Sequence, residues 1–142
     1  MKNEKHYWLY VLKQEQGKYY VGITSLTPEA RFKQHLNGFL GAEWTKAYKP
    51  IKIIQEVDLG VTTYEKAEVY ENKVTRKYIK EYGFNNVRGG DIRYRGNYVK
   101  RFGYLYTDKD WEDIIYNLIA LGLAIYVLID LIFNKKLFGH WY

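Results

Sequence analysis

The sequence predicts an α+β fold of three strands and two helices, followed by a hydrophobic helix at the C-terminus. Three segments, 6–13, 18–24 and 50–58, are rich in aromatic and β-branched residues or alternate in polarity, which is typical of strands. Two segments, 28–37 and 63–82, carry the start and stop signals of helices. The hydrophobic content of 47% is that of a folded globular chain.

Local sequence signals account for the connection between the first two strands and for the bounds of the first helix. Segment 14–18, QEQGK, joins the strands and supplies Gly17 for a short hairpin connection. In the helix that follows, Thr27 can cap the N-terminus, Pro28 takes the first helical position, and Asn37-Gly38 ends the helix.

The second predicted helix, about Thr63 to Tyr82, is the longer one. Thr62 and Glu65 have the spacing of a capping box, and Gly83 supplies the C-terminal stop. A loop rich in Gly and Arg, GFNNVRGGDIRYRGN, comes next.

Charge is unevenly distributed along the chain. Residues 1–103 hold 19 Lys and Arg against 11 Asp and Glu, whereas residues 104–142 hold 3 against 5. A basic segment suits a polyanion-binding protein, because each neutralised phosphate releases condensed counterions. Charge that only keeps the protein soluble is the alternative. The sequence therefore predicts two parts, a basic domain at 1–103 and a hydrophobic helical extension at 104–142.

The chain contains no cysteine, which excludes a disulfide framework and every thiolate-based metal site or nucleophile. Any metal must be held by oxygen atoms or by the three histidines. The N-terminal stretch MKNEKHYW lacks the apolar core of a secretory signal, so a cytoplasmic location is expected.

Glu71 is the most informative acidic residue in the longer helix. Steps of about 100° per residue place it on one face with Ala67, Tyr70, Val74 and Tyr78. A carboxylate on an apolar face is desolvated unless it is paired or bound to a cation. Two interpretations stay open here: Glu71 pairs with a nearby Lys or Arg, or it holds a metal ion.

Four further residues are candidates by type and position. Arg31 and His35 lie one turn apart on one helix face, where Arg offers a planar fork for phosphate oxygens and His can exchange a proton near neutral pH. Tyr10 and Tyr20 each lie inside one arm of the predicted hairpin, and Gly22 would let a ligand approach closely. A solvated helix face and ordinary strand packing are the alternatives.

The loop after the longer helix continues into a strip in which basic and aromatic residues alternate. Basic side chains bind phosphates and aromatic rings stack on bases, so the strip is a candidate nucleic-acid contact. A flexible basic loop without a partner is the alternative. The residues of the strip are Arg88, Arg93, Tyr94, Arg95, Tyr98, Lys100 and Arg101.

Taken together, these segments resemble the GIY-YIG endonuclease superfamily. Two tripeptides correspond to the pair that names the family, although Trp8-Leu9 stands in place of its Gly-Ile. The other elements follow in the family's order. The matching segments are Trp8-Leu9-Tyr10, Tyr20-Val21-Gly22, the R-x-x-x-H element from Arg31 to His35, Glu71-Asn72, and an Asn-bearing segment that begins at Asn86.

The resemblance covers roughly residues 6–91 and implies a three-stranded antiparallel sheet flanked by helices. Tyr10 would be the general base or would relay the proton of the attacking water, and Tyr20 would assist it by hydrogen bonding at the scissile phosphate. Arg31 would hold a phosphate oxygen while charge builds up in the transition state, and His35 would support this network.

The resemblance also implies a cofactor and an activity. Glu71 would coordinate a divalent ion, Mg²⁺ or Mn²⁺, and Asn86 would position part of the network through hydrogen bonds. The implied enzyme is a metal-dependent endonuclease that cleaves phosphodiester bonds of DNA and leaves a 5′-phosphate and a 3′-hydroxyl; RNA is the alternative substrate. A nucleic-acid-binding module of the same fold without cleavage is the alternative function.

The segment from Ile114 to Phe133 differs from the rest of the chain. Its twenty residues include only Asn117 and Asp130 as strongly polar members, so as a helix it is long enough to cross a hydrocarbon core. Its uninterrupted apolar run, Leu118 to Ile129, fits a buried packing or dimerisation helix equally well. A span with the basic domain in the cytoplasm would place Lys135-Lys136 outside, against the positive-inside tendency. Membrane contact and homodimerisation both stay open.

Overall fold

The computed structural model describes residues 3–38, 41–101 and 104–134, so Lys135-Lys136 lies outside the described residues. The chain forms two compact units, Met1–Asn97 and Tyr98–Tyr142. The division falls before Tyr98, whereas the charge distribution placed it after residue 103.

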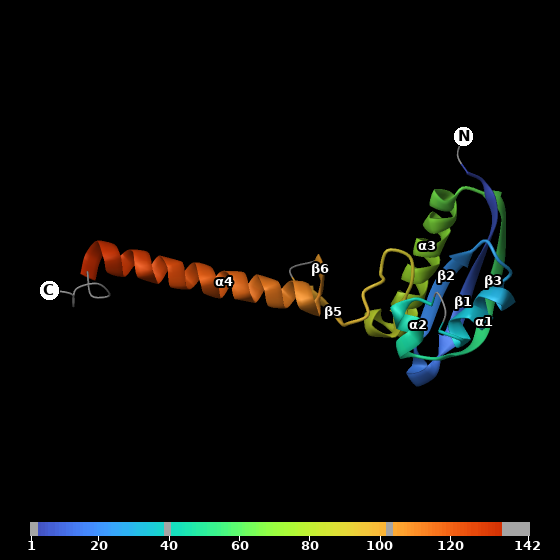
Figure 1. The fold of residues 1–142 in the computed structure, drawn as a ribbon, viewed down its shortest axis with the longest axis horizontal. Helices are drawn as coiled ribbons and strands as arrows, with labels where there is room; N and C mark the ends of the chain where they lie inside the picture. Colours follow the sequence, from blue (N-terminus) through green and yellow to red (C-terminus); the bar gives the residue numbers. More distant parts are fainter. Residues whose placement is uncertain (1–2, 39–40, 102–103, 135–142) are drawn as a thin grey trace. The chain divides into compact units, whose positions relative to one another are not determined.

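The first unit contains a mixed sheet of four strands flanked by helices (Figure 1). Strand β1 pairs antiparallel with β2 and β3, which confirms the three predicted antiparallel strands. A fourth strand, β4, pairs parallel with the start of β2. Its two residues are too few to produce a strand pattern in the sequence. The sheet order is β3-β1-β2-β4, with β1 at Lys5–Gln14, β2 at Tyr19–Thr24, β3 at Pro50–Thr62 and β4 at Val87–Arg88.

The two predicted helices are present. Helix α1 (Pro28–Leu36) is capped by the Thr27 side chain, which accepts a hydrogen bond from Ala30 N. Helix α3 (Tyr64–Tyr82) is capped by Thr63, which accepts from Lys66 N, so the cap is one residue later than predicted. A short third helix, α2 (Glu43–Ala47), was not predicted, because five residues give no helical period.

Short turns complete the first unit. The hairpin connection between β1 and β2 is a 3-10 turn at Glu15–Gly17, and a second 3-10 turn, η2 (Phe84–Asn86), leads from α3 into β4. Gly83 ends α3 with a φ of 87°, and its N–H donates to the carbonyl of Ile79. The predicted stop is therefore confirmed, since a left-handed φ favours glycine.

Helices α1 and α3 cover opposite faces of the sheet. Successive side chains of a strand point to opposite faces, and the neighbours Tyr19 and Tyr20 differ accordingly. The Tyr19 ring contacts Tyr78 and Tyr82 of α3, whereas the Tyr20 ring contacts His35 of α1. The core between these layers is built on the central strands, with Leu9, Val11, Leu12, Val21, Ala67 and Val87 all buried.

The second unit consists of a two-stranded hairpin and one long helix. Strands β5 (Tyr98–Arg101) and β6 (Tyr104–Thr107) pair antiparallel, and helix α4 (Asp108–Ile129) continues into a π-helical turn at Asp130–Asn134. The helix begins earlier than the predicted Ile114, because Thr107 and Asp110 form a capping box.

Candidate active site

The hydroxyl group of Tyr10 is hydrogen-bonded to the Nε2 atom of His35 at 2.8 Å. Strand β1 supplies the tyrosine and α1 supplies the histidine, and both side chains are buried. His35 therefore does not lie on a solvent-exposed face of its helix. The R-x-x-x-H spacing instead places His35 under the sheet face that carries both tyrosines.

The direction of this hydrogen bond follows from the other partners of the imidazole. Thr45 Oγ1 lies 2.8 Å from the carbonyl oxygen of Ala42, which can only accept, so the Thr45 hydroxyl proton is donated there. His35 Nδ1 lies 3.0 Å from Thr45 Oγ1 and must therefore be the protonated nitrogen that donates to it. Nε2 carries no proton and accepts the hydroxyl proton of Tyr10.

Burial mainly sets the charge states of Tyr10 and His35. Burial lowers the pKa of His35 to about 4, with the nearby Arg31 guanidinium acting in the same direction. Burial also raises the pKa of Tyr10 well above its ordinary value, although a hydrogen bond from Arg31 opposes the rise. At neutral pH the pair is thus a neutral phenol that donates to a neutral imidazole.

Gly22 is required by the packing of the two tyrosines. It lies directly opposite Tyr10 in the β1–β2 register, and a Cβ atom at Gly22 would lie 2.6 Å from the Tyr10 hydroxyl oxygen and 2.9 Å from Cε1 of Tyr20. The space that glycine leaves is therefore filled by the Tyr10 phenol. The expectation that it admits a ligand is wrong.

A pocket of about 300 Å³ lies at the outer edge of β2. Strand β4 pairs only with Tyr19 and Tyr20, so the rest of that edge is not covered by β4. Tyr20, Arg31 and Glu71 reach the pocket from β2, α1 and α3 respectively. The full lining is Tyr20, Ile23, Arg31, Gly41, Ala42, Tyr64, Glu71 and Arg93.

A second hollow of about 320 Å³ adjoins the first and shares Tyr20, Ala42 and Arg93 with it. Its other lining residues are Glu43, Trp44 and Arg88. These shared residues show that the two hollows lie next to each other.

Glu71 lies in the pocket with one oxygen unsatisfied. Only 4% of the residue is exposed, and its Oε2 atom has no hydrogen-bond partner among the residues that the structure describes. Burial raises the pKa of Glu71, while a hydrogen bond from the Gly90 backbone and the charge of Arg93 oppose the rise. The residues buried with it on α3 are Ala67, Thr75 and Ile79, so Tyr70, which is 54% exposed, was wrongly grouped with them.

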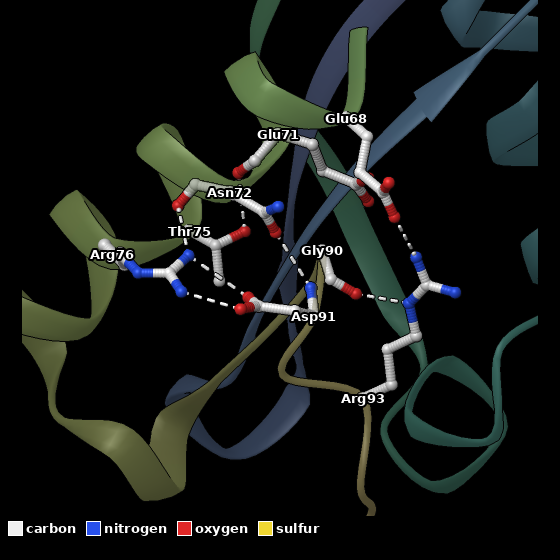
Figure 2. Close-up of polar contacts among 8 residues, drawn as sticks. All are labelled: Glu68, Glu71, Asn72, Thr75, Arg76, Gly90, Asp91 and Arg93. Atoms are coloured by element: carbon white, nitrogen blue, oxygen red, sulfur yellow. Dashed lines mark hydrogen bonds and ion pairs between the residues drawn. The ribbon is translucent and has the colours of Figure 1, made fainter. Parts of the chain in front are cut away.

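The loop after β4 is held on α3 by a polar cluster (Figure 2). Asn72 Oδ1 accepts from the backbone N–H of Asp91 at 2.8 Å, and Arg76 forms a two-pronged ion pair with the Asp91 carboxylate. Gly90 has a φ of 53°, and a Cβ there would lie 2.0 Å from Asn72 Oδ1. This close approach positions the Gly90 N–H beside Glu71.

Arg93 is brought to the pocket by the same loop. Its guanidinium donates to the Gly90 carbonyl and forms an ion pair with Glu68 at 3.0 Å. Figure 2 shows Glu68 and Glu71 projecting from α3 toward Arg93. The ion pair of Arg93 is with Glu68, but the charge of Arg93 also acts on Glu71, so both interpretations of Glu71 stay open.

Asn86 is not among the residues that line the described pocket. Its amide nitrogen donates to the carbonyl of Tyr82, and its oxygen accepts from Lys18 Nζ, each at 2.8 Å. These bonds tie η2 to the end of α3 and to the residue before β2. Asn86 therefore joins η2 to its neighbours, and its place in the catalytic network stays a prediction.

Arg88 contradicts the expectation that it contacts nucleic acid, because it is only 1% exposed. Its guanidinium carbon lies 4.3 Å from the centre of the Trp44 ring, a cation–π contact. The guanidinium also donates to four backbone carbonyls, those of Phe84, Val87, Tyr94 and Gly96. It therefore holds the loop together.

The remaining residues of the predicted strip are divided between the two units. Tyr94 and Arg95 are exposed on the first unit, beside the pocket residue Arg93. Tyr98, Lys100 and Arg101 belong to β5 in the second unit. The strip is therefore not one continuous surface of a single folded unit.

Thr45, which orients His35, is a site residue that the sequence did not predict. The residue lies in α2, which also anchors itself through Trp44, whose indole nitrogen donates to the Tyr19 carbonyl. Nothing in the sequence marked Thr45, because its role depends on a contact with a helix ten residues earlier in the chain.

The small α+β domain brings Tyr20, Arg31 and Glu71 to one pocket, with Tyr10 buried on the neighbouring strand β1. A family model described as the GIY-YIG catalytic domain matches residues 6–87. A curated relative, a UPF0213 protein of Enterococcus faecalis (strain ATCC 700802 / V583), is 34% identical over 85 residues, which make up 58% of this chain and 94% of the relative. No solved structure gives a significant match.

The chain belongs to the GIY-YIG family. The family is one of nucleases, and the matched residues lie within the first unit. The match to the relative uses nearly all of that protein but leaves a large part of this chain unmatched.

Proposed function

We propose that the first unit is a magnesium-dependent endonuclease that hydrolyses phosphodiester bonds of DNA. The observation that carries the proposal is the convergence of Tyr20, Arg31 and Glu71 on one pocket, with Tyr10 hydrogen-bonded to Arg31 and His35 beside it. The two adjoining hollows and the basic charge of the domain support a polyanionic, chain-like substrate.

Glu71 fits the role of ligand for the divalent ion. Within the described part of the chain, its Oε2 is a buried carboxylate oxygen without a hydrogen-bond partner. Burial of such an atom is energetically unfavourable unless a cation binds it. Mg²⁺ commonly binds through one or two carboxylates and takes its other ligands from water and phosphate. This agrees with the described residues, which contain no group of three or more His, Asp or Glu that could hold a metal. When bound, the ion would supply Lewis-acid stabilisation of the charge on the phosphate.

Arg31 and Tyr20 would hold the scissile phosphate. Arg31 lines the pocket and carries a planar, permanently charged donor group that can stabilise the phosphate oxygens in the transition state. Tyr20 is half-buried beside it, and its pKa is raised to about 12, mainly by burial. It therefore stays protonated and can donate a hydrogen bond to an oxygen of the phosphate.

Tyr10 and His35 would move the proton of the attacking water. In the free protein the Arg31 guanidinium donates a hydrogen bond to the Tyr10 oxygen, and the buried phenol stays protonated. As Arg31 turns to the phosphate, water takes its place on that oxygen. Tyr10 then accepts a proton from the water and passes its own hydroxyl proton to His35 Nε2, while the water oxygen bonds to phosphorus and the 3′ oxygen leaves, protonated by solvent.

The proposal is tested by nicking of supercoiled plasmid with and without Mg²⁺. Glu71→Gln should lower the rate roughly a hundredfold or more, the scale on which loss of one charge-stabilising group acts. Glu68→Gln is the matched control, because Glu68 lies one turn away on α3 and is more exposed; its rate should stay within several-fold of the intact protein.

Thermal unfolding separates lost activity from lost folding. Glu71→Gln removes the cost of burying an incompletely paired carboxylate, so it should unfold at the same temperature as the intact protein or higher when Mg²⁺ is absent. The proposal fails if the intact protein binds DNA without nicking it, or if Glu71→Gln nicks at the original rate.

A further inference from the structure

The apolar surface of α4 surrounds the whole helix. At about 100° per residue its exposed apolar side chains reach every side, unlike those of an amphipathic helix, which form one stripe. Each of these side chains is between 38% and 69% exposed. They are Ile115, Tyr116, Leu118, Ile119, Leu121, Leu123, Ile125, Tyr126, Val127, Leu128 and Ile129.

The length of the apolar helix matches the thickness of a bilayer. Residues Lys109–Phe133 form a helical stretch of 25 residues with a mean hydropathy of 2.2 in its most apolar window, of which 6% is buried. The apolar part, from Ile114 to Phe133, is about 30 Å long at 1.5 Å per residue, which is the thickness of a hydrocarbon core. A core helix of a soluble protein would be mostly buried, and a signal sequence would not follow a folded domain.

The polar groups of the second unit lie toward the ends of this helix. At the first turn the capping box of Thr107 and Asp110 satisfies backbone N–H groups that would otherwise face the membrane surface. The rings of Tyr106 and Trp111 lie 6.0 Å apart at the same end, and Tyr and Trp favour the membrane–water interface. Asp130 lies near the other end, where a carboxylate costs less than at the centre.

Two other partners that could cover the apolar surface of α4 explain these observations less well. A second copy of the chain in a two-helix contact would cover one stripe of α4 and leave the remaining apolar sides in water. The first unit already has its own buried core, in which Val11, Leu12 and Val21 are each 0% exposed, so it does not need α4 to complete it.

We propose that α4 spans a lipid bilayer once, as the anchor of the nuclease unit. The β5–β6 hairpin, which directly precedes α4 in the chain, then lies at the headgroup level. Lys135-Lys136 would then lie outside, but more basic residues precede the span than follow it, which favours a cytoplasmic first unit. In the sequence, four Lys and Arg occur in the twenty residues before Ile114, and two occur after Phe133.

The experiment is membrane fractionation of the full chain, which does not require nuclease activity. The intact protein should stay in the membrane pellet through an alkaline carbonate wash, dissolve in detergent, and float with phosphatidylcholine–phosphatidylglycerol vesicles when synthesised in their presence. The variant Leu123→Arg with Ala124→Arg places two charges at the centre of the helix, so most of the protein should no longer float.

The matched control is Phe133→Arg with Asn134→Arg, which adds the same two charges at the end of the span and should float like the intact protein. Glu71→Gln should also float, so a failed anchor and a failed nuclease are distinguishable. Release of the intact protein by carbonate overturns the proposal, as do a monodisperse dimer in detergent-free buffer and equal flotation of the Leu123→Arg, Ala124→Arg variant.

Discussion

The phenol oxygen of Tyr10 lies 2.8 Å from Nε2 of His35, and the phenol is the donor of this hydrogen bond. Thr45 decides the direction, because its own proton is committed to the Ala42 carbonyl and its oxygen can only accept from His35 Nδ1. The bond connects β1 with α1 and leaves an unprotonated imidazole nitrogen ready to receive the Tyr10 proton.

Thr45→Val should lower the nicking rate about tenfold without unfolding the domain. Valine has the shape of threonine but cannot accept from Nδ1, so His35 loses the group that selects its tautomer. Nitrogen NMR of labelled histidine should show one imidazole tautomer in the intact protein and a mixture in the variant. Thr45→Ser, which keeps the hydroxyl, should restore both the tautomer and most of the rate.

A merely structural role for Thr45 would give a different result. The melting temperature of Thr45→Val would then fall while the tautomer of the folded fraction stayed the same. Tyr10→Phe, which removes the proton-carrying oxygen, should be slower than Thr45→Val, because it removes the relay itself.

His35 should make the domain less stable as the pH falls from 6.5 to 4. Its pKa is about 4 in the folded protein and 6.5 as the ordinary value, so between these values the unfolded chain binds a proton that the folded protein does not. The free energy of unfolding should fall by up to about 3 kcal/mol over this range and change no further through His35 below it. Urea unfolding at a series of pH values measures the effect.

His35→Gln serves as the control, because glutamine does not titrate and keeps a polar group in the same place. The difference in unfolding free energy between the two proteins should shrink as the pH is lowered. If the difference is constant across the range, the imidazole is not held neutral by burial.

Gly22→Ala should destabilise the domain by about 1 to 3 kcal/mol and disturb both tyrosines, because the added methyl overlaps the Tyr10 hydroxyl and the Tyr20 ring. Chemical denaturation and nicking should both report the change. Gly17→Ala is the control: its φ of 68° makes alanine strained by about 1 kcal/mol, but nothing lies within 4 Å of the new Cβ. Normal nicking by Gly22→Ala would contradict the described packing.

Arg88→Ala should act on stability and not only on DNA binding. The substitution leaves buried carbonyl groups without a donor and removes the contact with Trp44, so a loss of about 3 kcal/mol is expected. Arg95→Ala, at an exposed position, should change stability by less than about 0.5 kcal/mol. If denaturation shows equal stability for both variants while Arg88→Ala weakens DNA binding, Arg88 is a substrate contact.

Local patterns predicted much of the fold, because their causes are local. Thr27 and Pro28 start α1 through hydrogen bonding and a preset φ, which need no distant partner. The predicted position of Glu71 on the buried face of α3 is also confirmed, since the helical period alone determines it. Strand β4 and helix α2 were not predicted, because two and five residues are too few for a periodic pattern to be recognised.

The sequence by itself determined the three antiparallel strands, the two longer helices, the family and the apolar C-terminal helix, because composition and spacing along the chain carry that information. Only the tertiary structure decided that Arg88 is a buried support, that the Gly22 gap holds Tyr10, and that Thr45 orients His35. These roles depend on which side chains meet across the sheet, and a contact between residues far apart in the chain leaves no periodic trace in either segment.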